Sequence, residues 1–304
     1  MTDRDAQSAP DESAGILYAG LAYSIWGIVP LYWRLLGDVP PFELTVHRVL
    51  WCALFVTLVA VWRGSLPRIV QIFRTPRLLG TLALTSVLIS ANWTIFIYCV
   101  ASRQLVEASL GYYITPLLSM ALGVFLFGER MSRLRLVGVA LGAAAVAIKT
   151  IGLGHFPWIA PALAFSFGFY GYFRKGAPVE ALDGLLVETW ILFPVTLALV
   201  AFWMAQGTSA FPSSNLEKDA LLIGGGPLTA IPLALFAAGA RRIRLSTLGF
   251  LQYLSPSITL VLAIFGFHEA FTRVDVIAFG CVFAALAIVA SEGRLNATRR
   301  IAES

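Results

Sequence analysis

Long apolar runs follow one another along almost the whole chain, separated by short segments that contain polar residues, glycine or proline. A membrane-spanning helix needs roughly 20 apolar residues, and the chain can be divided into ten runs of about that length. The pattern predicts helices at residues 15–36, 41–62, 78–101, 105–127, 132–151, 156–174, 182–204, 220–240, 246–267 and 273–292. A lipid-facing barrel would show alternating apolar and polar residues instead. The expected fold class is all-α, a polytopic membrane protein with ten transmembrane helices.

The composition supports this fold class. The chain has 304 residues, of which 58% are hydrophobic and 13% charged, and its mean hydropathy is +0.80. A soluble domain is about 25% charged, so the lipid bilayer is the expected surrounding. Cys52, Cys99 and Cys281 each lie inside an apolar run, without the spacing of a disulfide or a metal site. No metal and no cofactor are expected.

The basic residues indicate an orientation rather than a nucleic-acid partner. The formal net charge is +5, but the positive residues occur in short clusters between the apolar runs. Sixteen of the 22 lie on the side of the N-terminus, five lie on the other side, and Arg48 lies within a helix. The positive-inside rule then predicts that both ends, the polar residues 1–14 and the basic residues 293–304, are cytoplasmic. Residues 1–14 lack the features of a signal peptide, so the first helix is expected to be retained.

The two halves resemble each other at a shift of about 140 residues. The matching pairs are Tyr113 and Tyr253, Pro116 and Pro256, Leu122 and Leu262, Phe125 and Phe265, Phe127 and Phe267, Glu129 and Glu269, and Arg133 and Arg273. We interpret residues 15–151 and 152–292 as two five-helix repeats. An odd number of helices inverts the second repeat in the membrane, and inverted repeats are typical of transporters with alternating access. The alternative is that the duplication is only a relic of how the chain arose.

Several motifs together resemble one known family. They are His47-Arg48-Val49, Asn92-Trp93, the segment Glu107 to Tyr112, the segment Leu163 to Phe167, and the segment Arg244 to Phe250 followed by Gln252-Tyr253. The chain is similar to RarD proteins, a branch of the EamA-type permeases in the drug/metabolite transporter superfamily, over about residues 15 to 292. The resemblance implies ten helices in two inverted repeats, the bacterial inner membrane, transport of a small-molecule substrate, and a link by name to chloramphenicol sensitivity.

Ionisable residues at membrane depth are functional candidates, because they are costly to bury in lipid. His47 in the second helix occupies the place of Glu188 in the other repeat, next to the match of Val46 with Val187. If the halves face each other, His47 and Glu188 can approach and exchange a proton during a transport cycle. The alternative is a structural hydrogen bond between two helices. Arg48 is interpreted as structural, with a stem that snorkels or a fork that holds a neighbouring carbonyl.

Other polar and aromatic residues complete the candidate substrate-binding set. Asn92 and Trp93 lie in the middle of the third predicted helix, where an amide must find a partner in the substrate or in another helix. Tyr112 lies shortly before Pro116, and Gln252 and Tyr253 shortly before Pro256; each could serve as an aromatic or hydrogen-bonding wall or simply pack at an interface. The set also includes two residues beside glycines, Trp26 and Tyr170.

The sequence lacks the motifs of two other classes of protein, metal-dependent enzymes and nucleotide-driven pumps. The chain has neither an HExxH sequence nor the GxxxxGK[ST] loop of a nucleotide-binding protein, so an enzyme and a direct ATP-driven pump are not expected. A channel or a structural membrane protein stays open as the alternative to a carrier. Arg103 and Glu107, four residues apart, are interpreted as a local ion pair, and residues 63–77 as a loop on the inner membrane surface. An amino-acid-like or drug-like metabolite is the expected substrate.

Overall fold

The computed structural model describes residues 9–127 and 131–302, and every regular element within these ranges is a helix. The elements are α1 (Ala9–Leu35), α2 (Pro41–Trp62), α3 (Leu66–Phe73), α4 (Pro76–Ser102), α5 (Leu105–Phe127), α6 (Arg133–Leu153), α7 (Ile159–Lys175), α8 (Ala181–Ala205), α9 (Leu216–Ala240), α10 (Leu245–Leu251), α11 (Leu254–Val261), the π-helical turn η1 (Leu262–Gly266) and α12 (Arg273–Ala302). The all-α fold class is confirmed. Glu129, the repeat counterpart of Glu269, lies outside the described residues.

Nine segments of the described chain are long and apolar enough to cross a membrane. The sixth predicted span, residues 156–174, corresponds to α7, which has 17 residues and packs against both α4 and α5. The predicted count of ten spans is therefore reached only if α7 crosses the membrane in addition to these nine segments. The loop predicted at residues 63–77 contains the short helix α3, which buries Ile69 and Ile72.

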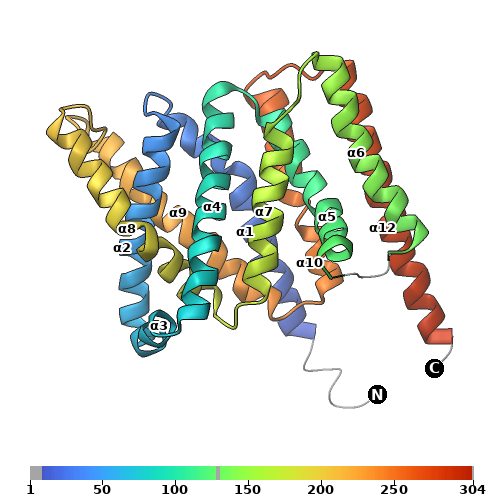
Figure 1. The fold of residues 1–304 in the computed structure, drawn as a ribbon, viewed down its shortest axis with the longest axis horizontal. Helices are drawn as coiled ribbons and strands as arrows, with labels where there is room; N and C mark the ends of the chain where they lie inside the picture. The colour runs from blue at the N-terminus through green and yellow to red at the C-terminus, as the bar shows by residue number, and fades with distance from the viewer. Residues whose placement is uncertain (1–8, 128–130, 303–304) are drawn as a thin grey trace.

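The two ends of the bundle can be told apart by the chain termini. Helix α1 begins and α12 ends at the same end, which also carries α3 (Figure 1). We call this the terminal end. The connection between α1 and α2 lies at the opposite end (Figure 1). Helices α6 and α12 run side by side along one flank of the bundle, and α2, α8 and α9 lie on the other flank (Figure 1).

The helix predicted at residues 246–267 is wrong as a single continuous element. The chain forms α10 and then α11, joined by a turn at Gln252 and Tyr253, and continues into η1. Proline has no N–H to donate and its ring clashes with the carbonyl four residues earlier, so Pro256 removes the helical bond to Gln252. The matching Pro116 lies inside the continuous helix α5.

Contacts between the two halves are reciprocal. Helix α1 packs against α9 and α11, while α7, its counterpart at a shift of about 140 residues, packs against α4 and α5. Helix α2 packs against α8, α5 against α11, and α6 against α12, so each of these helices contacts its own counterpart. Two five-helix units related by a two-fold axis would produce this pattern.

Two glycines allow these helices to approach closely. A Cβ atom at Gly111 in α5 would lie 2.7 Å from the carbonyl oxygen of Ala160 in α7. A Cβ atom at Gly226 in α9 would lie 2.5 Å from the carbonyl oxygen of Trp51 in α2. Any side chain at either position would push the helices apart, which is why small residues are common at helix contacts within membranes.

Candidate functional site

A buried arginine lies where α1, α2, α4 and α9 meet. The Arg48 side chain on α2 donates a hydrogen bond from Nε to Thr229 Oγ1 at 2.8 Å. Its Cζ atom lies 4.1 Å from the ring centroid of Trp93 and 5.3 Å from that of Trp33. Arg48 is only 8% exposed, and within the described residues no carboxylate oxygen lies within 4.0 Å of it.

The contacts of Arg48 with three other helices agree with the structural role that the sequence indicated, but they leave part of its charge without compensation. A buried cation is costly unless an anion or strong hydrogen bonds compensate it. Two indole faces and one hydroxyl provide only part of that compensation, since a desolvated cation–π contact stabilises by about 2 kcal/mol. The site therefore retains capacity for an acceptor or an anion.

Next to Arg48, Asn92 forms a hydrogen-bonded junction between α4, α5 and α7. Its Nδ2 donates to the Leu163 carbonyl at 3.2 Å and to Ser166 Oγ at 3.0 Å. The Tyr112 hydroxyl donates to Asn92 Oδ1 at 3.0 Å. Both ends of the amide thus have protein partners, which corresponds to the second of the two expected roles, a contact between helices.

Glu188 lies in a separate polar cluster on the terminal side of α8. Its Oε1 accepts a hydrogen bond from Thr85 Oγ1 at 2.7 Å and lies 3.4 Å from Arg174 Nε. The Tyr170 hydroxyl lies beside both Glu188 and Arg174. Glu188 is 1% exposed, so this carboxylate is compensated by one cation and by neighbouring hydroxyl groups. Sequence reasoning missed Arg174, because its partner lies fourteen residues away on another helix.

Ion pairs close the terminal end beside Glu188. Arg63 Nη2 lies 3.2 Å from Glu180 Oε2, and Arg68 lies 3.6 Å from the same carboxylate. Arg68 also donates from Nε to Asp183 Oδ2 at 3.0 Å. Asp183 is buried, and these pairs connect the end of α2 and the helix α3 to the start of α8.

The expected approach of His47 to Glu188 is wrong. Helices α2 and α8 run antiparallel, since Phe42 packs on Trp203 with ring centroids 6.2 Å apart, and Trp190 Nε1 donates to Thr57 Oγ1 at 2.8 Å. This register places His47 level with residues near 199, eleven residues from Glu188. At 1.5 Å per residue the two side chains are separated by about 16 Å along the axis.

His47 has other neighbours. Its Nε2 lies 3.8 Å from Glu43 Oε1, and its ring centroid lies 5.9 Å from that of Phe211. Neither ring nitrogen has a hydrogen-bond partner in the described part of the chain. Glu43 itself accepts a hydrogen bond from the Ala210 amide at 2.6 Å, so the carboxylate serves the connection between α8 and α9.

The remaining candidates lie in two aromatic clusters. Tyr113 and Tyr253, which match each other in the two repeats, are stacked with centroids 5.9 Å apart and planes 12° from parallel. The Tyr113 hydroxyl also hydrogen-bonds to Ser257, and Gln252 lies beside Tyr253. Trp26 packs elsewhere, against Tyr23 and Phe236. The structure thus divides the predicted set among several places instead of one pocket.

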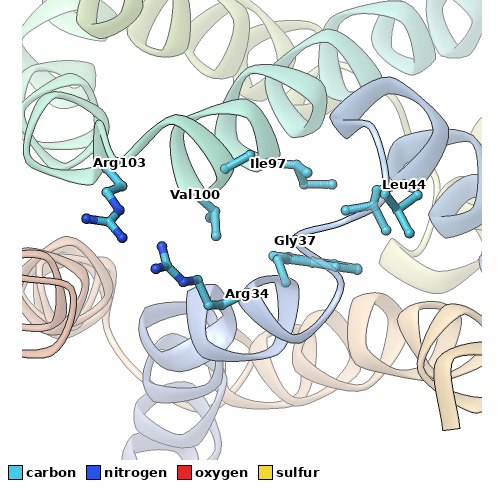
Figure 2. Close-up of a pocket in the computed structure, with 9 residues that line it drawn as sticks. Arg34, Gly37, Leu44, Ile97, Val100 and Arg103 are labelled. Atoms are coloured by element: carbon cyan, nitrogen blue, oxygen red, sulfur yellow. The ribbon is translucent and has the colours of Figure 1, made fainter.

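A cavity of about 310 Å³ opens at the opposite end between α1, α2 and α4. It is lined by Trp33, Arg34, Gly37, Val39, Leu44, Ile97, Val100, Ala101 and Arg103. The side chains of Arg34 and Arg103 point toward each other across it (Figure 2). The predicted ion pair of Arg103 with Glu107 is wrong, because Arg103 ends α4 in a left-handed conformation with φ 56°, and Glu107 instead faces the first amides of α7 at Ile159 and Ala160.

Among the described residues, no group of three or more His, Cys, Asp or Glu side chains could hold a metal ion. Together, the nine long apolar segments, the buried polar clusters and the cavity at one end define a multi-pass α-helical membrane protein. Residues 13–151 and again 158–291 match the EamA-like transporter family, and the chain belongs to that family.

Known relatives cover nearly the whole chain. The protein named "Protein RarD" of Streptomyces exfoliatus is 40% identical over 289 residues, which are 95% of this chain and 92% of that protein. A Pseudomonas aeruginosa protein named "Chloramphenicol-sensitive protein RarD" is 28% identical over 261 residues, covering 84% of this chain and 87% of that one. A solved crystal structure with 20% identity superposes with a TM-score of 0.57 over 93% of this chain and 98% of its own, which shows a shared fold.

Proposed function

We propose that this protein is a secondary transporter that moves a small amino-acid-like or drug-like metabolite across the bacterial inner membrane by alternating access. The observation that carries the proposal is the difference between the two ends of the bundle. A cavity of about 310 Å³ opens at the opposite end, beside the ion pair of Lys218 with Asp38, whereas several ion pairs join α8 to neighbouring segments at the terminal end. This is the arrangement expected of a carrier open to one side.

The reciprocal packing supports the alternating step. If residues 15–151 and 152–292 are inverted repeats, each contact of one half has a counterpart that can form when the other half moves. The stacked pair of Tyr113 and Tyr253 joins a residue to its own counterpart, so it lies close to the axis between the halves. We propose that the halves rock about this contact while the cavity closes and the ion pairs at the terminal end separate.

The orientation follows from the basic residues. The arginines of the terminal end, including Arg63 and Arg68, belong to the side on which the positive-inside rule places the cytoplasm. Both termini are then cytoplasmic, and the cavity between Arg34 and Arg103 faces the outside. Tags at the two termini, tested with a membrane-impermeant reagent on intact cells, should both be protected. Labelling of either tag would contradict this orientation.

We propose Arg48 as the centre of the substrate path, with Trp93 and Tyr112 as neighbouring contacts. Trp33 lines the cavity and also packs on Arg48, so a ligand that enters the cavity is one side chain away from the buried cation. We propose Trp26, Tyr170, Gln252 and Tyr253 as walls that a substrate meets further along, and Asn92 as the residue that holds the adjoining helices together.

Proton coupling is proposed at Glu188 rather than at a pair with His47. The Glu188 carboxylate is buried and compensated mainly by Arg174. We propose that opening of the terminal end moves α7 away from α8 and so separates the two groups, together with the hydrogen bonds from Arg174 to the carbonyls of Glu180 and Ala181. A buried carboxylate that loses its cation tends to take up a proton. His47 is proposed to contact the substrate in the outward-facing state only.

The test is flux in liposomes. Purified protein is reconstituted, and uptake of labelled amino acids and chloramphenicol is measured with and without a pH gradient, beside a matched Arg48→Gln variant. A carrier gives saturable flux that unlabelled substrate inhibits and that the variant lacks. Flux that never saturates would instead indicate a channel, and no flux of any labelled compound beyond that of empty liposomes would contradict transport of this substrate class. Chloramphenicol is included because one relative carries it in its name.

A further inference from the structure

The cavity at the opposite end has an unusual set of hydrogen-bonding side chains. They are the guanidinium groups of Arg34 and Arg103, which are donors without acceptor capacity. Trp33 also lines the cavity, with its Nε1 atom buried. The other lining side chains, such as Leu44, Ile97 and Val100, are apolar. A ligand that matches this lining has to supply acceptors and an apolar body.

In the part of the chain that the structure describes, these donors take part in no ion pair or hydrogen bond with the protein. Within the described residues no carboxylate oxygen lies within 4.0 Å of Arg34 or Arg103. Arg34 contacts the ring of Phe267 with its Cζ atom 5.1 Å from the centroid, which leaves its in-plane N–H groups available. The buried Trp33 Nε1 has no hydrogen-bond partner among those residues. An unsatisfied buried donor is rare in folded proteins, and here it belongs to a residue of the cavity wall.

We propose that this cavity binds a small organic anion, a monocarboxylate with an apolar body, between Arg34 and Arg103. The two guanidinium groups face each other from α1 and α4 (Figure 2), so a carboxylate between them accepts from both, while its apolar body lies against Leu44 and Ile97. Arginine is well suited to such a contact because its planar fork matches a carboxylate. A cationic ligand would meet two like charges. The inference rests on the proposed function in one respect only, namely that the ligand bound in this cavity is also the substrate that is transported.

The buried Arg48 extends the same charge preference inward. It contacts Trp33, which lines the cavity, and no carboxylate of the described chain compensates it. A carboxylate that leaves Arg34 and Arg103 can therefore move to a third cation, Arg48, which lies behind the Trp33 side chain. This order of cations, two at the mouth and one beneath, attracts a carboxylate and disfavours a ligand whose only charge is an ammonium group.

Direct binding tests the inference without transport. The full chain is placed in phosphatidylcholine nanodiscs, and benzoate, benzamide and benzylamine are titrated while intrinsic tryptophan fluorescence and heat are recorded. These probes share one ring and differ in charge. We expect benzoate to bind at least about tenfold more tightly than benzamide, because charge-assisted hydrogen bonds to a carboxylate are stronger than those to a neutral amide, and benzylamine to show no binding.

Variants assign the binding to this cavity. Arg34→Gln and Arg103→Gln should each weaken benzoate binding by about tenfold or more, with benzamide unaffected. Arg273→Gln, which removes an exposed arginine at the same end outside the cavity lining, is the matched control and should leave the affinity unchanged. Equal effects of all three variants would overturn the inference, because they would reflect only the general surface charge.

Further outcomes decide whether the bound anion is a free metabolite or a lipid headgroup. They also decide whether a negative result contradicts this inference or the proposed transport function. Nanodiscs that contain phosphatidylglycerol, at an ionic strength that screens the surface potential, should give the same benzoate affinity; a weaker affinity would assign the cavity to an anionic headgroup and overturn the inference. Equal binding of benzoate and benzamide would also overturn it, yet would leave transport of a neutral substrate intact. Benzoate binding without any flux would contradict the proposed function alone.

Discussion

The Arg48 cation contacts two indole rings, with its Cζ atom 4.1 Å from the centroid of Trp93 and 5.3 Å from that of Trp33. The only other partner of its guanidinium that the structure shows is Thr229 Oγ1, 2.8 Å from Nε. These three contacts come from α1, α4 and α9, whereas Arg48 belongs to α2. The Arg48 side chain thus connects four helices directly beneath the cavity of the opposite end. Its planar guanidinium group packs against the two indole rings.

The Arg48→Lys variant tests whether transport needs the planar guanidinium group or only its charge. Lysine retains the charge but has neither the Nε donor nor a planar group. Loss of one desolvated cation–π contact, about 2 kcal/mol, should lower the thermal midpoint of the detergent-solubilised protein, and the displaced charge should reduce substrate flux by about tenfold or more. Flux by the Arg48→Lys variant is compared with that by Arg273→Lys, which should equal the wild type. Normal flux in both variants would mean that charge alone matters at this position.

Replacing Glu188 by glutamine should uncouple transport from protons. The amide keeps the hydrogen bond from Thr85 but cannot be ionised, and it no longer attracts Arg174. We expect flux by Glu188→Gln to become independent of an imposed pH gradient and to fall by tenfold or more. Flux is measured in liposomes with the pH gradient reversed, and Glu12→Gln, which changes an exposed carboxylate at the start of α1, serves as the control. A gradient dependence that survives in Glu188→Gln would remove Glu188 from the proton pathway.

The buried ion pair of Lys149 and Asp275 joins α6 to α12. Lys149 Nζ lies 2.6 Å from Asp275 Oδ1, and both side chains are less than 10% exposed. Removing one partner leaves the other charge buried without compensation, which costs about 3–5 kcal/mol. Lys149→Met should therefore lower the thermal midpoint strongly.

The double variant Lys149→Met with Asp275→Leu should recover most of the loss, because a well-packed apolar pair can replace a buried ion pair. Lys175→Met, at an exposed position, is the control for removing a lysine. A double variant less stable than Lys149→Met would show that Asp275 contributes mainly through its bonds to Thr272 rather than through Lys149.

Glu269 caps α5 from the other half of the chain. Its two carboxylate oxygens accept hydrogen bonds from the amides of Leu105 and Val106, at 3.0 and 2.9 Å. The first amides of a helix have no partner within it, and loss of such a cap costs about 1 kcal/mol. Glu269→Ala should lower the free energy of unfolding by about 1–2 kcal/mol, measured by denaturant titration in micelles, whereas Glu217→Ala at an exposed position of α9 should not. Equal stability of both variants would argue against the cap.

The positions of the helices could be predicted from the sequence, because a run of apolar residues must be a helix to satisfy its backbone within lipid. The run at 41–62 and the run at 105–127 coincide with α2 and α5. There are two exceptions. The predicted loop at residues 63–77 contains the helix α3, which buries Ile69 and Ile72, and the predicted helix at residues 246–267 is broken at Gln252.

Candidate residues could be selected from the sequence, but the partners of these residues could not be predicted. Asn92, Trp93 and Tyr112 could be selected because polar and aromatic groups at membrane depth need an explanation. Their neighbour Arg48 was interpreted as structural, since the two indole rings around it come from other helices. His47 and Glu188 were paired because they match in the repeats, yet an antiparallel register moves matching residues to opposite depths unless they lie near the axis, as Tyr113 and Tyr253 do.

Taken alone, the sequence established which segments are long and apolar enough to cross a membrane, because hydrophobic length is a local property of consecutive residues. Only the tertiary structure decided which ionisable groups compensate one another: Arg174 with Glu188, Lys149 with Asp275, and Glu269 with the start of α5. These contacts join groups that are 14, 126 and 164 residues apart. Their energy falls steeply with distance, so they depend on how the helices pack and not on the order of residues within any one helix.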